Sequence, residues 1–266
     1  MPPVTDISPL AWVALAGAAM VIGVSKTALP GAGTVVIAVF AAVLPARAST
    51  GALLGLLLLG DLFALALYRR HADLGILRRL APPVVLGLGG GALFLLLADD
   101  ARVRVTIGVI LLALTAVTLV RRWLAERRVR ASDATAGPDE AGVPDATTPH
   151  RAVTILYGSI AGFTTMVANA GGPAMSLYLL AMRLDVRSFL GTSAWFYFAV
   201  NLSKVPFAVG IGTVTGHSLL FDLLLAPAVV VGALIGRAVV ARIRPAVFDA
   251  VVLVLTVVGA VNLLVG

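Results

Sequence analysis

The sequence of 266 residues contains no cysteine, and its three histidines are isolated from one another. Without cysteine the chain can form neither a disulfide framework nor a reactive thiol. His71, His150 and His217 do not have the spacing of ligands to one metal ion. There is no Walker motif for ATP-driven transport. No nucleophile with a paired base is visible either, so we expect no enzyme activity and no cofactor.

Charged residues are also scarce, at 12% of the chain, while hydrophobic residues make up 60%. Soluble domains have roughly 25% charged and 45 to 50% apolar residues, so water cannot be the main solvent of this chain. The hydrophobic residues form blocks of about 15 to 20, the length that crosses ~30 Å of hydrocarbon as a helix. The composition therefore predicts an all-α polytopic (multi-pass) protein of the plasma membrane, surrounded by the lipid bilayer.

We expect about ten hydrophobic segments in two sets of five, separated by a polar linker. The linker, 129–150, is rich in Ala, Thr, Asp, Gly and Pro without an apolar period, which is typical of a flexible connection. It divides the chain into a first membrane repeat, 1–128, and a second membrane repeat, 151–266. The expected segments are 9–25, 32–45, 50–68, 81–98 and 103–120, followed by 152–168, 172–183, 188–208, 219–238 and 246–265.

The two sets of segments resemble each other, which indicates an internal duplication. A shift of 140 residues aligns the first part of each repeat, and a shift of 145 aligns the later part. The matched pairs include Gly31 with Gly171, Gly51 with Gly191, Asp61 with Asn201, Gly87 with Gly232, and Gly91 with Gly236.

The arginines account for the net charge of +7 without nucleic acid, because most of them lie at the ends of hydrophobic segments. When the segments alternate in direction, the arginine-rich loops fall on one face, which the positive-inside rule makes cytoplasmic. Both termini are then outside. Because each repeat has an odd number of crossings, the second is an inverted repeat of the first, as in many secondary transporters. A re-entrant hairpin in place of the first pair of segments would keep this parity.

Each repeat has an interruption rich in Gly, Pro and polar residues after its first segment. Broken helices at matching positions point to a binding site, since half-helix N-termini offer unpaired N–H groups and a positive dipole end to an anion. An ordinary loop between two spans is the alternative. The candidate residues are Ser25, Lys26, Thr27, Gly31 and Gly33 in the first interruption, and Thr165, Asn169, Gly171 and Gly172 in the second.

The chain has only two lysines, Lys26 and Lys204, and both lie within or beside hydrophobic segments. A charge near the bilayer centre costs at least ~2.5 kcal/mol, so each lysine is a candidate for function, with snorkelling to the interface as the alternative. Asp61 stands alone in the third segment and is a candidate for proton coupling or for neutralising a lysine. A structural ion pair or a hydrogen bond between helices is the alternative. The counterpart of Asp61, Asn201, is also polar. Tyr197, one turn earlier, is typical of packing.

Two arginines on the expected outer and inner faces complete the candidate site. Arg47 and Arg187 each precede a glycine by four residues at the start of a long segment. A guanidinium group suits bidentate binding of sulfonate or carboxylate oxygens. The alternative is that these arginines only cap the membrane interface.

The duplicated plan, the two Gly- and Pro-rich interruptions, and the stretch 201–206 with its Asn, Ser and Lys resemble the TauE/SafE family of sulfite and organosulfonate exporters. The resemblance implies export of sulfur-containing anions such as sulfite or sulfoacetate. It carries the family's glycine-rich breaks onto Gly31, Gly33, Gly171 and Gly172, and its basic residue onto Lys204. The first repeat has Ala64 at the position that matches Lys204, so two identical half-sites are not expected.

The sequence therefore predicts a secondary transporter that exports a small sulfur-containing anion by alternating access. A passive anion channel and an importer of a similar anion are the alternatives within transport. The expected partners are the anion and the bilayer, with no nucleic acid, and a homodimer is compatible with the sequence. The predicted substrate-binding residues are Ser25, Lys26, Thr27, Gly31, Gly33, Arg47, Thr165, Asn169, Gly171, Gly172, Arg187, Asn201 and Lys204, with Asp61 for proton coupling.

Overall fold

A computed structural model describes residues 7–28, 33–134, 151–182 and 184–239, and four single positions near the C-terminus, 257, 261, 264 and 265. Over these ranges the chain is helical and contains no strand. The helices are α1 (Pro9–Thr27), α2 (Gly33–Val43), α3 (Ala46–Tyr68), the short 3-10 helix η2 (Arg69–His71), α4 (Leu74–Leu97), α5 (Asp100–Ala134), α6 (Arg151–Ala168), α7 (Gly172–Ala181), α8 (Val186–Ile211) and α9 (Gly216–Val239).

Six of the described helices are long and apolar enough to cross a membrane: α1, α3, α4, α6, α8 and α9. This finding agrees with a polytopic helical membrane protein. Nine of the ten predicted segments coincide with a helix, and the tenth, 246–265, lies almost wholly outside the described residues. The helices α2 and α7 are short, at 11 and 10 residues. At 1.5 Å per residue each rises only ~15 Å, about half of the hydrocarbon thickness.

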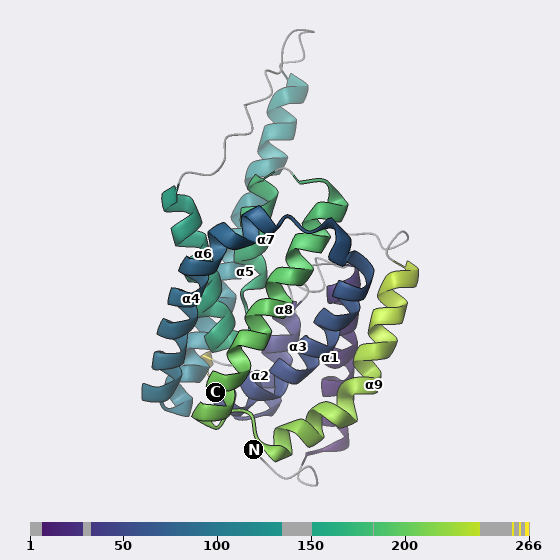
Figure 1. The fold of residues 1–266 in the computed structure, drawn as a ribbon, viewed down its shortest axis with the longest axis vertical. Helices are drawn as coiled ribbons and strands as arrows, with labels where there is room; N and C mark the ends of the chain where they lie inside the picture. The colour runs from purple at the N-terminus through teal and green to yellow at the C-terminus, as the bar shows by residue number, and fades with distance from the viewer. Residues whose placement is uncertain are drawn as a thin grey trace.

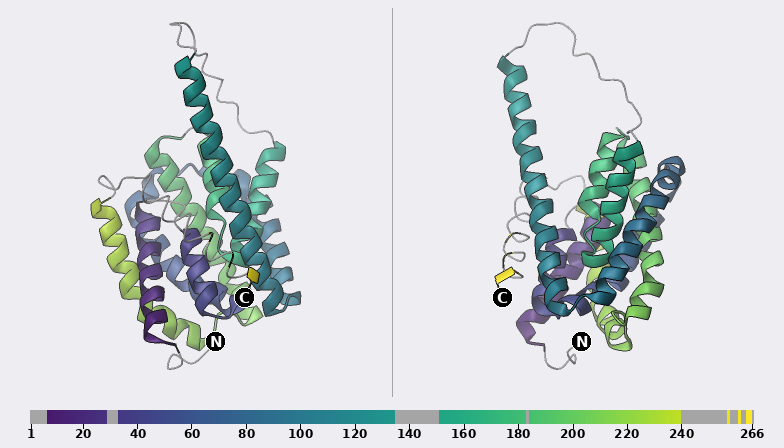
Figure 2. Two further views of the ribbon diagram at one scale, coloured as in Figure 1. Left: turned by 180° about the vertical axis from the view of Figure 1, so that it is seen from behind. Right: turned by 90° about the vertical axis from the view of Figure 1, so that its left-hand side faces the viewer.

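The helix α5 is longer than predicted, because it continues to Ala134 while its apolar segment ends near residue 120. Its last turns are rich in Ala, Glu and Arg, which are strong helix formers, so the helix continues where apolar residues end. Figure 2 shows this helix running along one side of the bundle and extending beyond it. The predicted linker therefore begins inside α5, and its remainder, 135–150, lies outside the described residues.

Several helices begin at a residue whose side chain accepts a hydrogen bond from the first turn. The Ala11 amide donates to Ser8 Oγ over 3.3 Å at the start of α1, and the Ile76 amide donates to Asp73 Oδ1 over 3.1 Å at the start of α4. Asp185 accepts from two amides at the start of α8. These caps fix where the spans begin, because a first turn otherwise leaves its N–H groups unpaired.

The helices α3 and α8 run antiparallel through the middle of the bundle (Figure 1). Glycines permit close approach at both ends of this pair. A Cβ on Gly51 would lie 1.9 Å from the carbonyl oxygen of Thr213, just after α8, and a Cβ on Gly191 would lie 2.7 Å from that of Tyr68, at the end of α3. Only glycine fits such contacts, so these residues fix the register of the two helices.

The flanking helices pack in two parallel pairs, α1 with α9 and α4 with α6. Glycines again lie at both crossings. A Cβ on Gly232 of α9 would lie 2.0 Å from the backbone of α1, and a Cβ on Gly23 of α1 would lie 2.1 Å from the backbone of α9. The second crossing has the same form, since a Cβ on Gly87 of α4 or on Gly162 of α6 would lie 2.2 Å from the other helix. Each pair therefore joins helices from different predicted repeats.

The two ends of the bundle differ in charge. Arg69 and Arg70 follow α3, and the indole of Trp195, near the start of α8, donates to the Arg69 carbonyl oxygen over 3.2 Å. We call this the arginine end. At the opposite end the Arg47 amide, at the start of α3, donates to Asp100 Oδ1, at the start of α5, over 2.9 Å. Three other arginines of the loops that were predicted to be cytoplasmic, Arg183, Arg242 and Arg244, lie outside the described residues.

Candidate functional site

The centre of the bundle holds a direct contact between the two polar residues that the repeat alignment pairs. Asp61 lies fifteen positions after the first residue of α3, and Asn201 lies fifteen positions after the first residue of α8. Because these helices are antiparallel, both residues lie near mid-span. The Asn201 amide nitrogen donates to Asp61 Oδ2 over 2.7 Å. Both side chains are buried.

Lys26, in the last turn of α1, forms an ion pair with Asp61 of α3. Its ammonium nitrogen lies 2.5 Å from Asp61 Oδ1, and 4.4 Å from the centre of the Tyr197 ring. Gly60 makes room for this side chain, since a Cβ there would lie 2.9 Å from Lys26 Cγ. The Lys26 side chain is 13% exposed, whereas that of Asp61 is 0% exposed. The lysine therefore remains accessible from the cavity described below, while the carboxylate is covered.

Lys204, one turn after Asn201 on α8, is buried deeper than Lys26. Its ammonium group donates to Asn169 Oδ1, to Asn201 Oδ1 over 3.2 Å and to Thr165 Oγ1 over 3.5 Å. An ammonium group has three hydrogens, so these three acceptors satisfy it without water. Asn201 thus bridges the two lysine clusters, with its amide nitrogen on Asp61 and its amide oxygen on Lys204.

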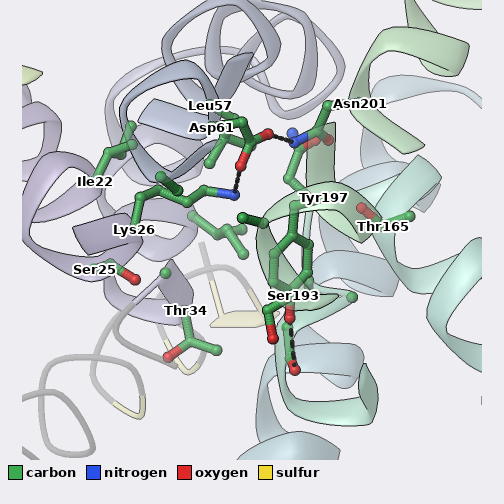
Figure 3. A pocket seen from close by; sticks show the side chains of 18 of the residues that line it. Ile22, Ser25, Lys26, Thr34, Leu57, Asp61, Thr165, Ser193, Tyr197 and Asn201 are labelled. Atoms are coloured by element: carbon green, nitrogen blue, oxygen red, sulfur yellow. Dashed lines mark hydrogen bonds and ion pairs between the residues drawn. The ribbon is translucent and has the colours of Figure 1, made fainter. Parts of the chain in front are cut away.

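A cavity of about 70 Å³, measured as the space open to the centres of water-sized molecules, lies between these groups (Figure 3). One water needs roughly 10 to 15 Å³ on this measure, so the cavity holds a few waters or one small anion. The ammonium group of Lys26 and the carboxylate of Asp61 line it, and the ammonium group of Lys204 lies behind its wall. The lining residues are Ile22, Ser25, Lys26, Gly33, Thr34, Ile37, Leu57, Asp61, Ala64, Thr165, Asn169, Ala170, Gly171, Gly172, Leu190, Ser193, Ala194, Tyr197 and Asn201.

Two half-helix N-termini also face this cavity. The first described residue of α2 is Gly33 and that of α7 is Gly172, and both line the cavity. The first N–H groups of a helix have no partner within it, and the N-terminal end carries a partial positive charge. Together with the lysines, these ends make the cavity suited to an anion rather than to a cation.

The ends of the two interruptions are held by side chains from the central helices. The Tyr68 hydroxyl donates to the Thr27 carbonyl oxygen over 3.0 Å, and the Tyr197 hydroxyl donates to that of Gly172 over 3.2 Å. Asn169 adopts a left-handed backbone with φ of 55°, which asparagine tolerates better than most residues. Non-helical backbone at this depth is therefore supported by protein, as it must be in a membrane.

The structure brings most of the predicted site residues to one place. Those that line the cavity are Ser25, Lys26, Gly33, Thr165, Asn169, Gly171, Gly172 and Asn201, with the proton-coupling candidate Asp61. Lys204 lies behind the wall, in contact with three of them.

Four predicted site residues are not part of this group. The Thr27 hydroxyl donates to the carbonyl oxygens of Gly23, over 2.9 Å, and of residue 233 on α9, over 3.3 Å, so it serves helix packing. Arg47 and Arg187 lie in the first turns of α3 and α8, at opposite ends of the bundle. Gly31 lies outside the described residues.

The sequence reasoning did not select Tyr197, Ser193 and Thr34, although all three line the cavity. Tyr197 was interpreted as a packing residue. A signal for two of them does exist, because Ser193, Tyr197 and Asn201 recur every four positions and therefore form a polar stripe along α8.

A family model described as "Sulfite exporter TauE/SafE" matches residues 15–263. The chain belongs to this family. The match confirms the resemblance that the interruptions and the repeat pattern suggested, and it covers every residue of the central cluster. No curated protein and no solved structure matches the chain. Members of the TauE/SafE family are membrane transporters and not enzymes, so the central cavity is the candidate substrate site of a sulfite or organosulfonate exporter-type transporter.

Proposed function

We propose that this chain exports small sulfur-containing anions, namely sulfite, sulfoacetate or a related organosulfonate, across the plasma membrane by alternating access. The observation that carries the proposal is the central cavity that Lys26 lines, with two half-helix N-termini at its wall. A site of this kind attracts an anion and repels a cation. The arginine end is then the cytoplasmic end.

The contacts between helices support an inverted repeat as the framework of this transport. Gly87 and Gly232 are matched by the sequence repeat, and each packs on the first helix of the other half. Gly51 and Gly191 are also matched, and each packs on the turn that ends the partner's central helix. Such reciprocal contacts are expected of two halves related by a twofold axis in the membrane plane. Rocking of one half against the other would then alternate access to the cavity.

The charges around Lys26 suggest how an anion binds. In the structure Lys26 is paired with Asp61, so an anion entering the cavity competes with this carboxylate for the ammonium group. Further donors toward the anion are the amide of Asn169, the hydroxyl of Ser193, and the N–H groups at the starts of α2 and α7. Lys204 lies behind Asn169 and adds positive potential without direct contact.

Binding of an anion panel to the purified protein in detergent tests the proposal. Calorimetry or thermal shift should show selective binding of sulfite or sulfoacetate over taurine, sulfate and acetate. Lys26→Ala should abolish this binding, because it removes the accessible cation. Arg187→Ala is the matched control, since it removes a cation in the first turn of α8, outside the cavity, and should bind normally. If no anion binds to the folded protein, the proposed substrate class fails.

The role of Asp61 has a separate test. Asp61→Asn keeps the shape of the side chain and its contact with Asn201, and the Lys26 side chain that loses its partner is 13% exposed, so the protein should still fold. If Asp61 links transport to protons, this variant should change the pH dependence of anion flux. A pH dependence identical to that of the wild type removes the coupling role.

A further inference from the structure

The cavity occupies only one half of the bundle. Its lining residues on α8 run from Leu190 to Asn201, and those on α3 run from Leu57 to Ala64. Both stretches lie between mid-span and the arginine end, because α3 ends and α8 begins there. The cavity thus lies toward the arginine half and does not extend into the opposite half.

The repeat alignment shows which residues fill the opposite half. A shift of 140 places Leu190, Ser193 and Ala194, which line the cavity, on Thr50, Leu53 and Leu54 of α3. Ser193 and Ala194 are as buried as these three α3 residues, but the α3 residues line no part of the cavity. In an inverted repeat the two stretches would exchange roles between inward-open and outward-open states.

Two hydrogen bonds hold the opposite half to the cavity wall. The Thr50 hydroxyl donates to the Val167 carbonyl oxygen over 3.1 Å, which is nearer than the Ala46 carbonyl oxygen of its own helix at 3.3 Å. The Asn169 amide nitrogen donates to the Thr50 carbonyl oxygen over 3.0 Å. Among the described helices α3 and α6 do not pack along each other, so these bonds are a local contact between them. The matching position on α8 is Leu190, which has no hydroxyl, so the other half cannot form a side-chain bond like that from Thr50 to Val167.

Asn169 belongs to both the contact and the substrate cavity. Its amide oxygen accepts from Lys204, its amide nitrogen reaches Thr50, and the residue lines the cavity. An anion that takes a hydrogen bond from this amide, or attracts Lys204, changes the position of the group that binds Thr50. The contact is therefore placed to respond to the contents of the cavity.

We propose that Thr50 is a positioning residue: its hydroxyl on Val167 and its carbonyl oxygen on Asn169 tie α3 to the end of α6 and keep the opposite half closed, so that anion binding in the cavity is coupled to opening of that half. The inference rests on the proposed alternating access, but it concerns a residue on which the substrate proposal does not depend. Loss of the Thr50 hydroxyl should shift the protein toward the state that is open at the opposite end.

Cysteine accessibility measures this shift directly, because the chain has no native cysteine. Ser193→Cys reports on the half that holds the cavity and Leu53→Cys on the opposite half. Each is combined with Thr50→Val, which removes the hydroxyl at nearly constant shape, and with Thr50→Ser, which retains it. Thr115→Val is the control for loss of a buried threonine hydroxyl on α5, away from the cavity. A membrane-impermeant maleimide is applied to vesicles of either orientation.

A hydrogen bond of about 0.5 to 1.5 kcal/mol changes the ratio of two states by roughly 2- to 12-fold. Thr50→Val should therefore raise the labelling rate at position 53 and lower that at position 193 by several fold, while Thr50→Ser and Thr115→Val should match the parent. Unchanged rates, or rates that rise at both positions, would overturn the coupling. If Thr50→Val does not fold, Thr50→Ala carries the same expectation.

The same vesicles separate this inference from the proposed function. If sulfite or sulfoacetate protects position 193 from labelling but Thr50→Val has no effect on the labelling rates, the proposed function is supported and the proposed role of Thr50 is wrong. If none of the anions protects position 193 while Thr50→Val still shifts both rates, the role of Thr50 is supported and the proposed substrate class is wrong.

Discussion

Removing Lys26 alone from the Lys26–Asp61 ion pair should destabilise the protein far more than removing both charges. The carboxylate is 0% exposed, so Lys26→Met leaves it buried with only the Asn201 amide as a donor. Breaking a buried pair by removing one partner costs about 3 to 5 kcal/mol. Because the lysine side chain is 13% exposed to the cavity, we expect the lower end of that range.

The double variant Lys26→Met/Asp61→Asn removes the uncompensated charge and keeps the shapes of both side chains. Its stability should return to within about 1 kcal/mol of the wild type, because apolar or neutral replacements of a buried pair are often nearly neutral. The pair therefore predicts a coupling free energy of at least ~2 kcal/mol in a double-mutant cycle.

Thermal unfolding in detergent, followed by tryptophan fluorescence, measures this cycle. A loss of ~3 kcal/mol corresponds to a fall in melting temperature of roughly 6 to 12 °C for a chain of this size. Lys26→Met should show that fall, and the double variant should recover most of it without regaining anion binding. If the double variant is as unstable as Lys26→Met, the ion pair does not stabilise the fold, and the reasoning is refuted.

Two further predictions concern packing and capping. Gly232→Ala should lower the melting temperature, because the new Cβ would lie 2.0 Å from the Met20 carbonyl oxygen. Gly89→Ala is the control, because a Cβ there would have no neighbouring atom within 4 Å, and it should leave the melting temperature unchanged or raise it slightly. Hydrogen bonds from Ser188 hold the pKa of Asp185 below its usual 3.8, so the carboxylate stabilises α8 above that pH and loses this effect as pH falls through the lower folded value. Asp185→Ala should therefore lower the melting temperature at pH 7, with a difference that shrinks as the pH falls below 3.8. Equal effects of the two alanines, or a difference that persists in acid, would contradict these predictions.

The helices could be predicted because a membrane span needs a long apolar block, and that signal is local in sequence. The residues at which helices end were less predictable. The helix α5 continues to Ala134, since helix-forming residues need no apolar face once the helix leaves the bundle. The predicted equivalence of Asp61 and Asn201 came from the repeat alignment, and the structure brings these two side chains into contact.

The composition of the cavity could be predicted only in part. Broken helices and isolated lysines are visible in the sequence because they interrupt an apolar pattern. Which lysine meets Asp61 depends on the depth at which α1 ends, and no local pattern encodes that depth. The same limit applies to Arg47 and Arg187, whose spacing from a glycine suited a binding site although the helix starts place them at the ends of the bundle.

The central claim is that the cavity carries a sulfur-containing anion through the membrane by alternating access. The most direct test measures initial efflux of sulfite, sulfoacetate and acetate from proteoliposomes as a function of internal concentration, for the wild type and Lys26→Ala. We predict efflux that saturates for a sulfur-containing anion, is accelerated by the same anion outside, and is lost in Lys26→Ala. Efflux that rises linearly with concentration, does not distinguish acetate from sulfoacetate, or survives in Lys26→Ala would contradict the account.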